Sequence, residues 1–166
     1  MTKIASHLAN YAAYHRDSRN IAIHMLGIPL IVLAIEMLLS RPSLMAAGFP
    51  LTPAFLLAVA AATYYLTLDL RLGLSMTAFL ALGLWLGDSV AALPTSKWLT
   101  IGLGTFVLGW VLQFIGHILE GRKPAFMDDL RGLLIGPLFV AAEIGFALGL
   151  RRDLKKAVDQ RTARSS

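Results

Sequence analysis

The sequence lacks cysteine and has few charged residues, and both shortages narrow its class. Without cysteine, the chain has no disulfide, no thiolate metal site and no cysteine nucleophile. Charged residues make up 15% of the 166 residues, whereas soluble domains carry about 25%. Hydrophobic residues reach 57%, more than a water-soluble domain of this length can bury. A phosphate-cradling glycine loop is also missing. We therefore expect an integral membrane protein without a nucleotide site.

Positive charge is concentrated at the C-terminal end of the chain. The net charge is +5, and the tail at residues 151–166 holds a large share of the fifteen Lys and Arg residues. A basic segment directly after an apolar stretch binds anionic lipid headgroups. We therefore expect membrane lipid, and no nucleic acid, as its partner.

Several stretches are apolar and long enough to cross a bilayer, which takes about 20 mostly apolar residues. A further apolar stretch at 133–150 is short and is interrupted by Gly136 and Pro137, so we expect it to be re-entrant, interfacial or packed against the bundle. Residues 1–17 place apolar side chains on one helical face, as in an interfacial helix. The sequence thus predicts one all-α domain, an integral membrane helical bundle with about four spanning helices at 21–40, 51–68, 72–93 and 98–118.

The distribution of Lys and Arg predicts how the bundle is oriented. If four segments span and the N-terminus is cytoplasmic, all Lys and Arg residues except Arg41 and Lys97 lie on the cytoplasmic side. Cytoplasmic loops of membrane proteins carry an excess of these residues. We therefore expect both termini to be cytoplasmic, with 133–150 not crossing.

Two histidines, His15 and His24, bracket the start of the first apolar stretch. They are nine residues apart, which on one straight helix is about two and a half turns, so the side chains would face opposite ways. A bend within the polar run Arg16–Asn20 would let them meet. Asp17, Ser18 or Asn20 is suited to cap a helix that begins there.

A third histidine, His117, lies near the end of the fourth predicted span. Gln113, His117 and Glu120 share one helical face, because they are spaced at i, i+4 and i+7. With the orientation above, His117 and Glu120 reach the same membrane face as His15 and His24. Imidazole nitrogens are common ligands of iron, zinc and copper, and two or three of them with open positions resemble a non-haem iron site. The sequence therefore predicts a metal site at this face.

Other interpretations of the histidines remain open from the residues alone. They are also compatible with polar side chains that reach the headgroups, with axial ligands of a haem, or with a path through a scaffold or transporter. Zinc is an alternative to iron. His7 has no supporting partner in the pattern, and we expect it on the surface.

Two longer motifs resemble the Mpo-like membrane protein family. The first is "YHRDSRNIAIHMLGIP" (14–29), with Tyr-His, then Asn, His and Gly-x-Pro at the family's spacing. The second is "QFIGHILEGRKPAFMDDLRGLLIGPLFVAAE" (113–143), which is similar to the family's later block. Together they cover about 50 residues, in the family's order.

The resemblance implies an enzyme. Characterised fungal members are Fe(II)-dependent dioxygenases of the endoplasmic reticulum that shorten 2-hydroxy fatty acids by one carbon with O2, a fatty acid alpha-oxidation. The family's essential histidines match His15, His24 and His117, expected here as metal ligands, and its glutamate matches Glu120. For this function, Arg122 or Lys123 is suited to hold the substrate carboxylate, and Tyr11 and Tyr14 are placed to reach the site. The expected substrates are a 2-hydroxy fatty acid and O2.

Overall fold

The computed structural model describes residues 3–46, 49–122, 124 and 129–164. The described part of the chain is helical except for one short hairpin, as the composition predicted. The elements in chain order are α1 (Lys3–Ala12), α2 (Ser18–Leu39), β1 (Leu44–Ala46), β2 (Phe49–Leu51), α3 (Pro53–Leu68), α4 (Leu70–Ala91), α5 (Thr95–Glu120), α6 (Arg131–Ala147) and α7 (Arg152–Arg164).

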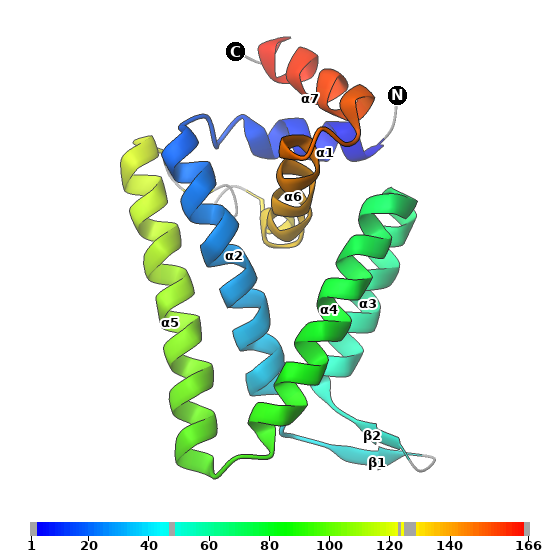
Figure 1. The fold of residues 1–166 in the computed structure, drawn as a ribbon, viewed down its shortest axis with the longest axis vertical. Helices are drawn as coiled ribbons and strands as arrows, with labels where there is room; N and C mark the ends of the chain where they lie inside the picture. The colour runs from blue at the N-terminus through cyan, green and yellow to red at the C-terminus, as the bar shows by residue number, and fades with distance from the viewer. Residues whose placement is uncertain (1–2, 47–48, 123, 125–128, 165–166) are drawn as a thin grey trace.

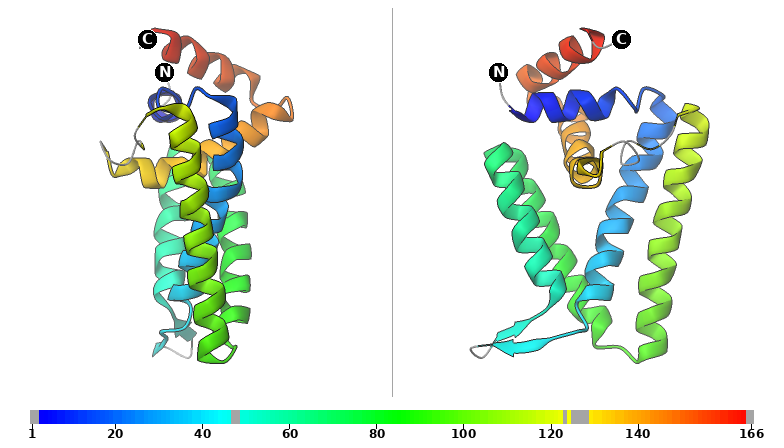
Figure 2. Two further views of the ribbon diagram at one scale, coloured as in Figure 1. Left: turned by 90° about the vertical axis from the view of Figure 1, so that its left-hand side faces the viewer. Right: turned by 180° about the vertical axis from the view of Figure 1, so that it is seen from behind.

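Two helix pairs form a V, as Figure 1 shows: α2 packs along α5, and α3 packs along α4. The pairs meet where α2 contacts α4, near the hairpin, and separate toward the end that carries both termini. Helix α6 lies between the two arms of the V and runs across the bundle (Figure 2). Helices α1 and α7 cover the same end of the bundle.

Three helices are long and apolar enough to cross a membrane: α2, α4 and α5. Helix α3, at the second expected span, has 16 residues and is shorter. Helices α6 and α7 pass the same test only as one pair, bent by 118°. The described chain thus has three potential spans, or four if the bent pair of α6 and α7 counts as one. This confirms the predicted fold class, an all-α membrane bundle.

The link between the first two predicted spans contains a hairpin that the sequence did not predict. Strands β1 and β2 pair antiparallel, with Leu44 opposite Leu51. Helix α3 follows at once, because the Thr52 side chain accepts a hydrogen bond from the backbone N–H of Phe55 and Pro53 fits the first helical turn. Of the predicted span 51–68, only Leu51 lies in the hairpin, and α3 covers the rest from Pro53 onward.

The N-terminal helix is amphipathic, and its apolar face is covered. Ile4 and Leu8 are buried, and they belong to the same hydrophobic cluster as Leu154 and Val158 of α7. A bidentate ion pair between Arg151 and Asp69, with two N–O distances of 2.6 Å, ties the start of α7 to the α3–α4 turn. These contacts fix the termini over the end of the bundle at which the histidines lie.

Candidate metal centre

The turn between α1 and α2 brings the first two histidines together. Helix α1 ends at Ala12, and α2 begins at Ser18, where the Asp17 side chain accepts a hydrogen bond from the backbone N–H of Arg19. The bend predicted within Arg16–Asn20 is therefore confirmed, with Asp17 as the cap. Across it, the Nε2 atoms of His15 and His24 are 3.2 Å apart.

Helix α5 supplies the third histidine because it packs very closely on α2. A Cβ on Gly109 would lie 2.7 Å from Cγ1 of Ile31 and 3.0 Å from the carbonyl oxygen of Gly27, so only glycine permits this approach. Two turns farther along α5, His117 places its Nε2 atom 3.2 Å from that of His24. The ligand atoms of the three histidines all lie within 4.8 Å of one another.

All three imidazole rings are buried: His15 is 2% exposed, His24 1% and His117 7%. Burial lowers the pKa of His15 to about 4, so its ring is neutral at physiological pH. Neutral imidazole is the form that binds a metal ion. Burial therefore favours the neutral form of the imidazole rings, which can bind a metal ion.

Hydrogen bonds to the backbone fix the tautomer of the His15 and His24 rings. The Nδ1–H of His15 donates to the Tyr11 carbonyl at 2.9 Å, and the Nδ1–H of His24 donates to the Asn20 carbonyl at 3.0 Å. A carbonyl oxygen can only accept, so each of these neutral rings carries its proton on Nδ1 and a lone pair on Nε2. Two lone pairs that face each other at 3.2 Å repel, unless a cation lies between them.

Two of the three separations between the nitrogens fit one shared ion. Two imidazole nitrogens bound to one ion at about 2.1 Å are about 3 Å apart, close to the two 3.2 Å separations of the triad. The residues present thus fit a transition metal held by His15, His24 and His117, which are the three ligands expected from the sequence.

Glu120 holds the bend in place and uses both carboxylate oxygens for this. Its Oε1 accepts the backbone N–H of Arg16 at 2.9 Å, and its Oε2 accepts the backbone N–H of Asp17 at 2.9 Å and the side-chain amide of Asn20 at 3.0 Å. Gly121, with φ 67°, ends α5 directly after it. This glutamate connects the end of α5 to the turn that carries His15.

Asn20 is a site residue whose sequence context indicated only a helix cap. It is fully buried, its backbone carbonyl orients His24, and its side chain binds Glu120. Gly116 makes room for it, because a Cβ there would clash with the Asn20 Oδ1. No local pattern identifies this role, since Glu120 and Gly116 lie about a hundred residues away.

The residues predicted to bind the substrate do not all lie at the same place in the structure. The Tyr11 ring stacks on His15 at 4.2 Å, with 7° between the planes, and lines a cavity next to the triad. Tyr14 lines a smaller neighbouring pocket. Arg122 is exposed and donates to the Ala13 carbonyl at 3.0 Å, and Lys123 lies outside the described residues. Of the described members of this set, only Tyr11 lines the cavity.

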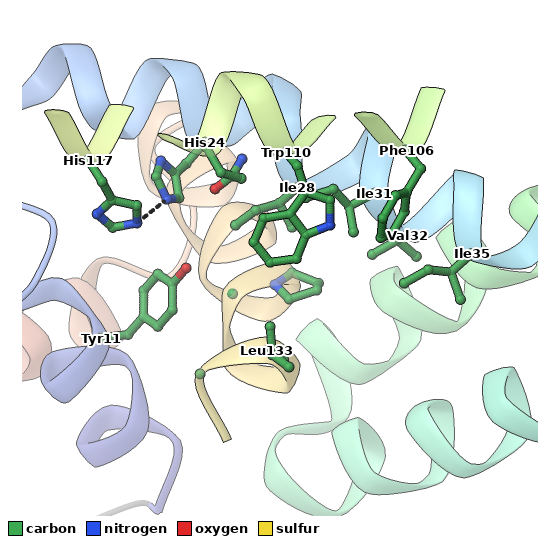
Figure 3. A pocket seen from close by; sticks show the side chains of 14 residues that line it. Tyr11, His24, Ile28, Ile31, Val32, Ile35, Phe106, Trp110, His117 and Leu133 are labelled. Carbon is green, nitrogen blue, oxygen red and sulfur yellow. Dashed lines mark hydrogen bonds between the residues drawn. The ribbon is translucent and has the colours of Figure 1, made fainter. Parts of the chain in front are cut away.

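The cavity lies between α2, α5 and α6, and its walls are mainly apolar (Figure 3). It has a volume of about 230 Å³, far more than the ~30 Å³ share of one water molecule. His24 and His117 form part of its wall, beside Tyr11. Burial raises the pKa of the Tyr11 hydroxyl above its usual range, so the hydroxyl remains a hydrogen-bond donor.

Comparison with known proteins identifies the family of the chain. The family model described as "2-hydroxy-palmitic acid dioxygenase Mpo1-like" matches residues 1–148. The 2-hydroxy-palmitic acid dioxygenase MPO1 of Saccharomyces cerevisiae is 32% identical over 159 residues, which cover 94% of this chain and 87% of the yeast protein. No solved structure matches. The chain therefore belongs to the 2-hydroxy-palmitic acid dioxygenase Mpo1-like family, as its two motifs predicted.

Proposed function

We propose that this protein is an Fe(II)-dependent dioxygenase that shortens 2-hydroxy fatty acids by one carbon. The reaction balances as a 2-hydroxy acid plus O2 giving the acid one carbon shorter, CO2 and water. The names of the family and of the yeast relative, both those of a 2-hydroxy-palmitic acid dioxygenase, support the substrate and O2.

The observation that carries this proposal is the convergence of three imidazole Nε2 atoms. Two of them, on His15 and His24, have their tautomer fixed by backbone carbonyls, so the triad is preorganised for a cation. An Fe(II) ion held there would supply the one-electron chemistry that O2 needs to react with an organic acid. The three rings lie with centroids only 4.5–5.1 Å apart, which leaves no room for a macrocycle between them and favours a single ion over a haem.

The protein's own groups would bind and orient the substrate. The apolar cavity accepts the acyl chain and excludes water from the reacting end. The Tyr11 hydroxyl, kept protonated by burial, is placed to donate a hydrogen bond to an oxygen of the substrate. Glu120 acts as a positioning residue, because its oxygens are used by the turn.

We also propose that the end of the bundle with both termini and the histidines faces the cytoplasm. Arg16, Arg19, Arg71 and the basic helix α7 gather at this end, whereas Arg41 and Lys97 lie at the other. The test uses a cysteine introduced near the C-terminus, which is the only thiol because the chain has no other cysteine. In sealed vesicles with their cytoplasmic face inward, this cysteine should be protected from a membrane-impermeant thiol reagent.

The function is tested by comparing wild-type protein with His117→Ala and His7→Ala. Purified wild type should contain about one iron per chain and consume O2 with 2-hydroxypalmitate but not with palmitate. His117→Ala should lose both iron and turnover. His7→Ala is the matched control, because His7 lies on α1 outside the triad, and it should retain both. Iron and turnover retained by His117→Ala would refute the site, and a Soret band in the wild type would favour haem.

A further inference from the structure

The cavity beside the histidines is elongated and has two chemically different ends. Figure 3 shows Tyr11, His24 and His117 at one end and Val32, Ile35 and Phe106 at the other. Between them, the wall is made mainly of apolar groups: Ile28, Ile31, Trp110, Leu133 and Pro137. A ligand with a polar head and a long apolar tail matches this arrangement.

The length of the cavity can be read along two helices. Ile35 follows His24 by eleven residues on α2, and Phe106 precedes His117 by eleven residues on α5. At about 1.5 Å per residue, both walls are about 16 Å long. An acyl chain in one membrane leaflet fills half of a hydrocarbon core of about 30 Å, or about 15 Å. The cavity is therefore as long as a long-chain fatty acyl group.

At the far end of the cavity, helices α2 and α5 pack closely on each other. Phe106 packs against Trp110, with ring centroids 6.2 Å apart. One turn beyond Phe106, α5 touches α2 directly, because a Cβ on Gly102 would lie 2.5 Å from Cδ2 of Leu38. An acyl chain that extends from the histidine end therefore meets Phe106 and Ile35 and has no continuation between these two helices.

Among the described residues, the side of the cavity between α5 and α6 is only partly covered. Helix α6 packs on α1, α2 and α4, whereas α5 packs mainly on α2. Leu133 of α6 lines the cavity and is still 49% exposed. A lipid-soluble substrate can thus enter sideways without passing through water.

We propose that this cavity is an acyl-chain channel, and that Phe106 and Ile35 at its far end set the longest chain that is accepted. The inference rests on the proposed function, because it places the reacting end of the substrate at His24 and His117. It adds the identity of the two residues that limit the length of the acyl chain.

The test uses a series of saturated 2-hydroxy acids from about 12 to about 24 carbons, since one methylene in an apolar pocket changes kcat/KM by about 10- to 200-fold. Phe106→Ala should raise kcat/KM for acids longer than 2-hydroxypalmitate, relative to 2-hydroxypalmitate, by about tenfold. Ile35→Trp should shift the preference to shorter acids. Phe55→Ala and Ile101→Trp are the matched controls, because both side chains are exposed and outside the cavity, and they should keep the wild-type profile.

A second measurement does not depend on turnover: displacement of a fluorescent fatty acid by the same acids, with iron content and helical circular dichroism confirming that each variant is folded. If wild type turns over none of the acids, the proposed function fails, and the displacement series alone decides the channel. An unchanged chain-length profile in folded Phe106→Ala and Ile35→Trp, in turnover or in displacement, overturns the channel. Should Phe106→Ala fail to fold, the profile of Ile35→Trp alone supports or overturns it.

Discussion

Replacing Glu120 by alanine should weaken metal binding without abolishing it. The substitution leaves three donors without their acceptor: the backbone N–H groups of Arg16 and Asp17 and the amide of Asn20. Hydrogen bonds to a charged acceptor contribute about 1.5–3 kcal/mol each when they are buried. The bond to Arg16 is exposed and the other two are only partly buried, so water replaces part of all three. We therefore expect a loss of about 2–4 kcal/mol in the free energy of unfolding.

The same change should loosen the bend that carries His15 and the carbonyl that orients His24. Removing a group that orients a metal ligand lowers metal affinity by about 10- to 100-fold. The assay is competition between the protein and a chelator of known affinity, with bound iron measured by elemental analysis. Glu120→Gln should fall between wild type and Glu120→Ala, because its amide oxygen keeps only part of the acceptor set. Asp88→Ala is the control, an exposed carboxylate on α4.

Two results would refute this reasoning. Unchanged metal affinity and stability in Glu120→Ala would show that the carboxylate does not hold the turn. Complete loss of metal, equal to that of His117→Ala, would show that Glu120 is itself a ligand.

Two further predictions follow from contacts around the site and at the termini. Gly116→Ala should lower the free energy of unfolding by about 1–3 kcal/mol and reduce the iron content, because the added Cβ clashes with Asn20. Gly104→Ala on the same helix is the control and should be neutral or slightly stabilising, because its Cβ would meet nothing within 4 Å. Equal effects of the two variants on denaturant unfolding in detergent would contradict the packing. Asp69→Asn should lower stability by about 2 kcal/mol at neutral pH, because hydrogen bonds from Arg151 lower the Asp69 pKa to about 2. The difference from wild type should be complete above about pH 4 and disappear as the pH falls through about 2, since protonation removes the pair; a pH-independent difference would contradict it.

The three-histidine site was predictable because its parts have local signals. The bend follows from a polar run with a capping aspartate, and the position of His117 follows from helical spacing and from which end of a span it occupies. Hydropathy and charge predicted a helical membrane bundle for the same reason: both are properties of contiguous residues.

Other features needed the folded chain. The role of Glu120 depends on backbone N–H groups about a hundred residues away, and Arg122 binds the Ala13 carbonyl. Nothing in the sequence near Phe106 indicates that it ends a cavity, because the other walls come from α2 and α6. Helix α6 lies across the bundle instead of along it, in the space between two helix pairs.

The sequence by itself thus determined the class of the protein, its main helices and the three side chains that meet. The class and the helices depend on residues within a few turns of one another, where periodicity, capping and apolar length act directly. The meeting of the histidines followed from the end of its predicted span at which each one lies. Only the tertiary structure decided how the bend is held, how close the Nε2 atoms of His24 and His117 lie and which helices line the cavity. These depend on close contacts between segments distant in the chain, and such contacts exist only after the helices have packed.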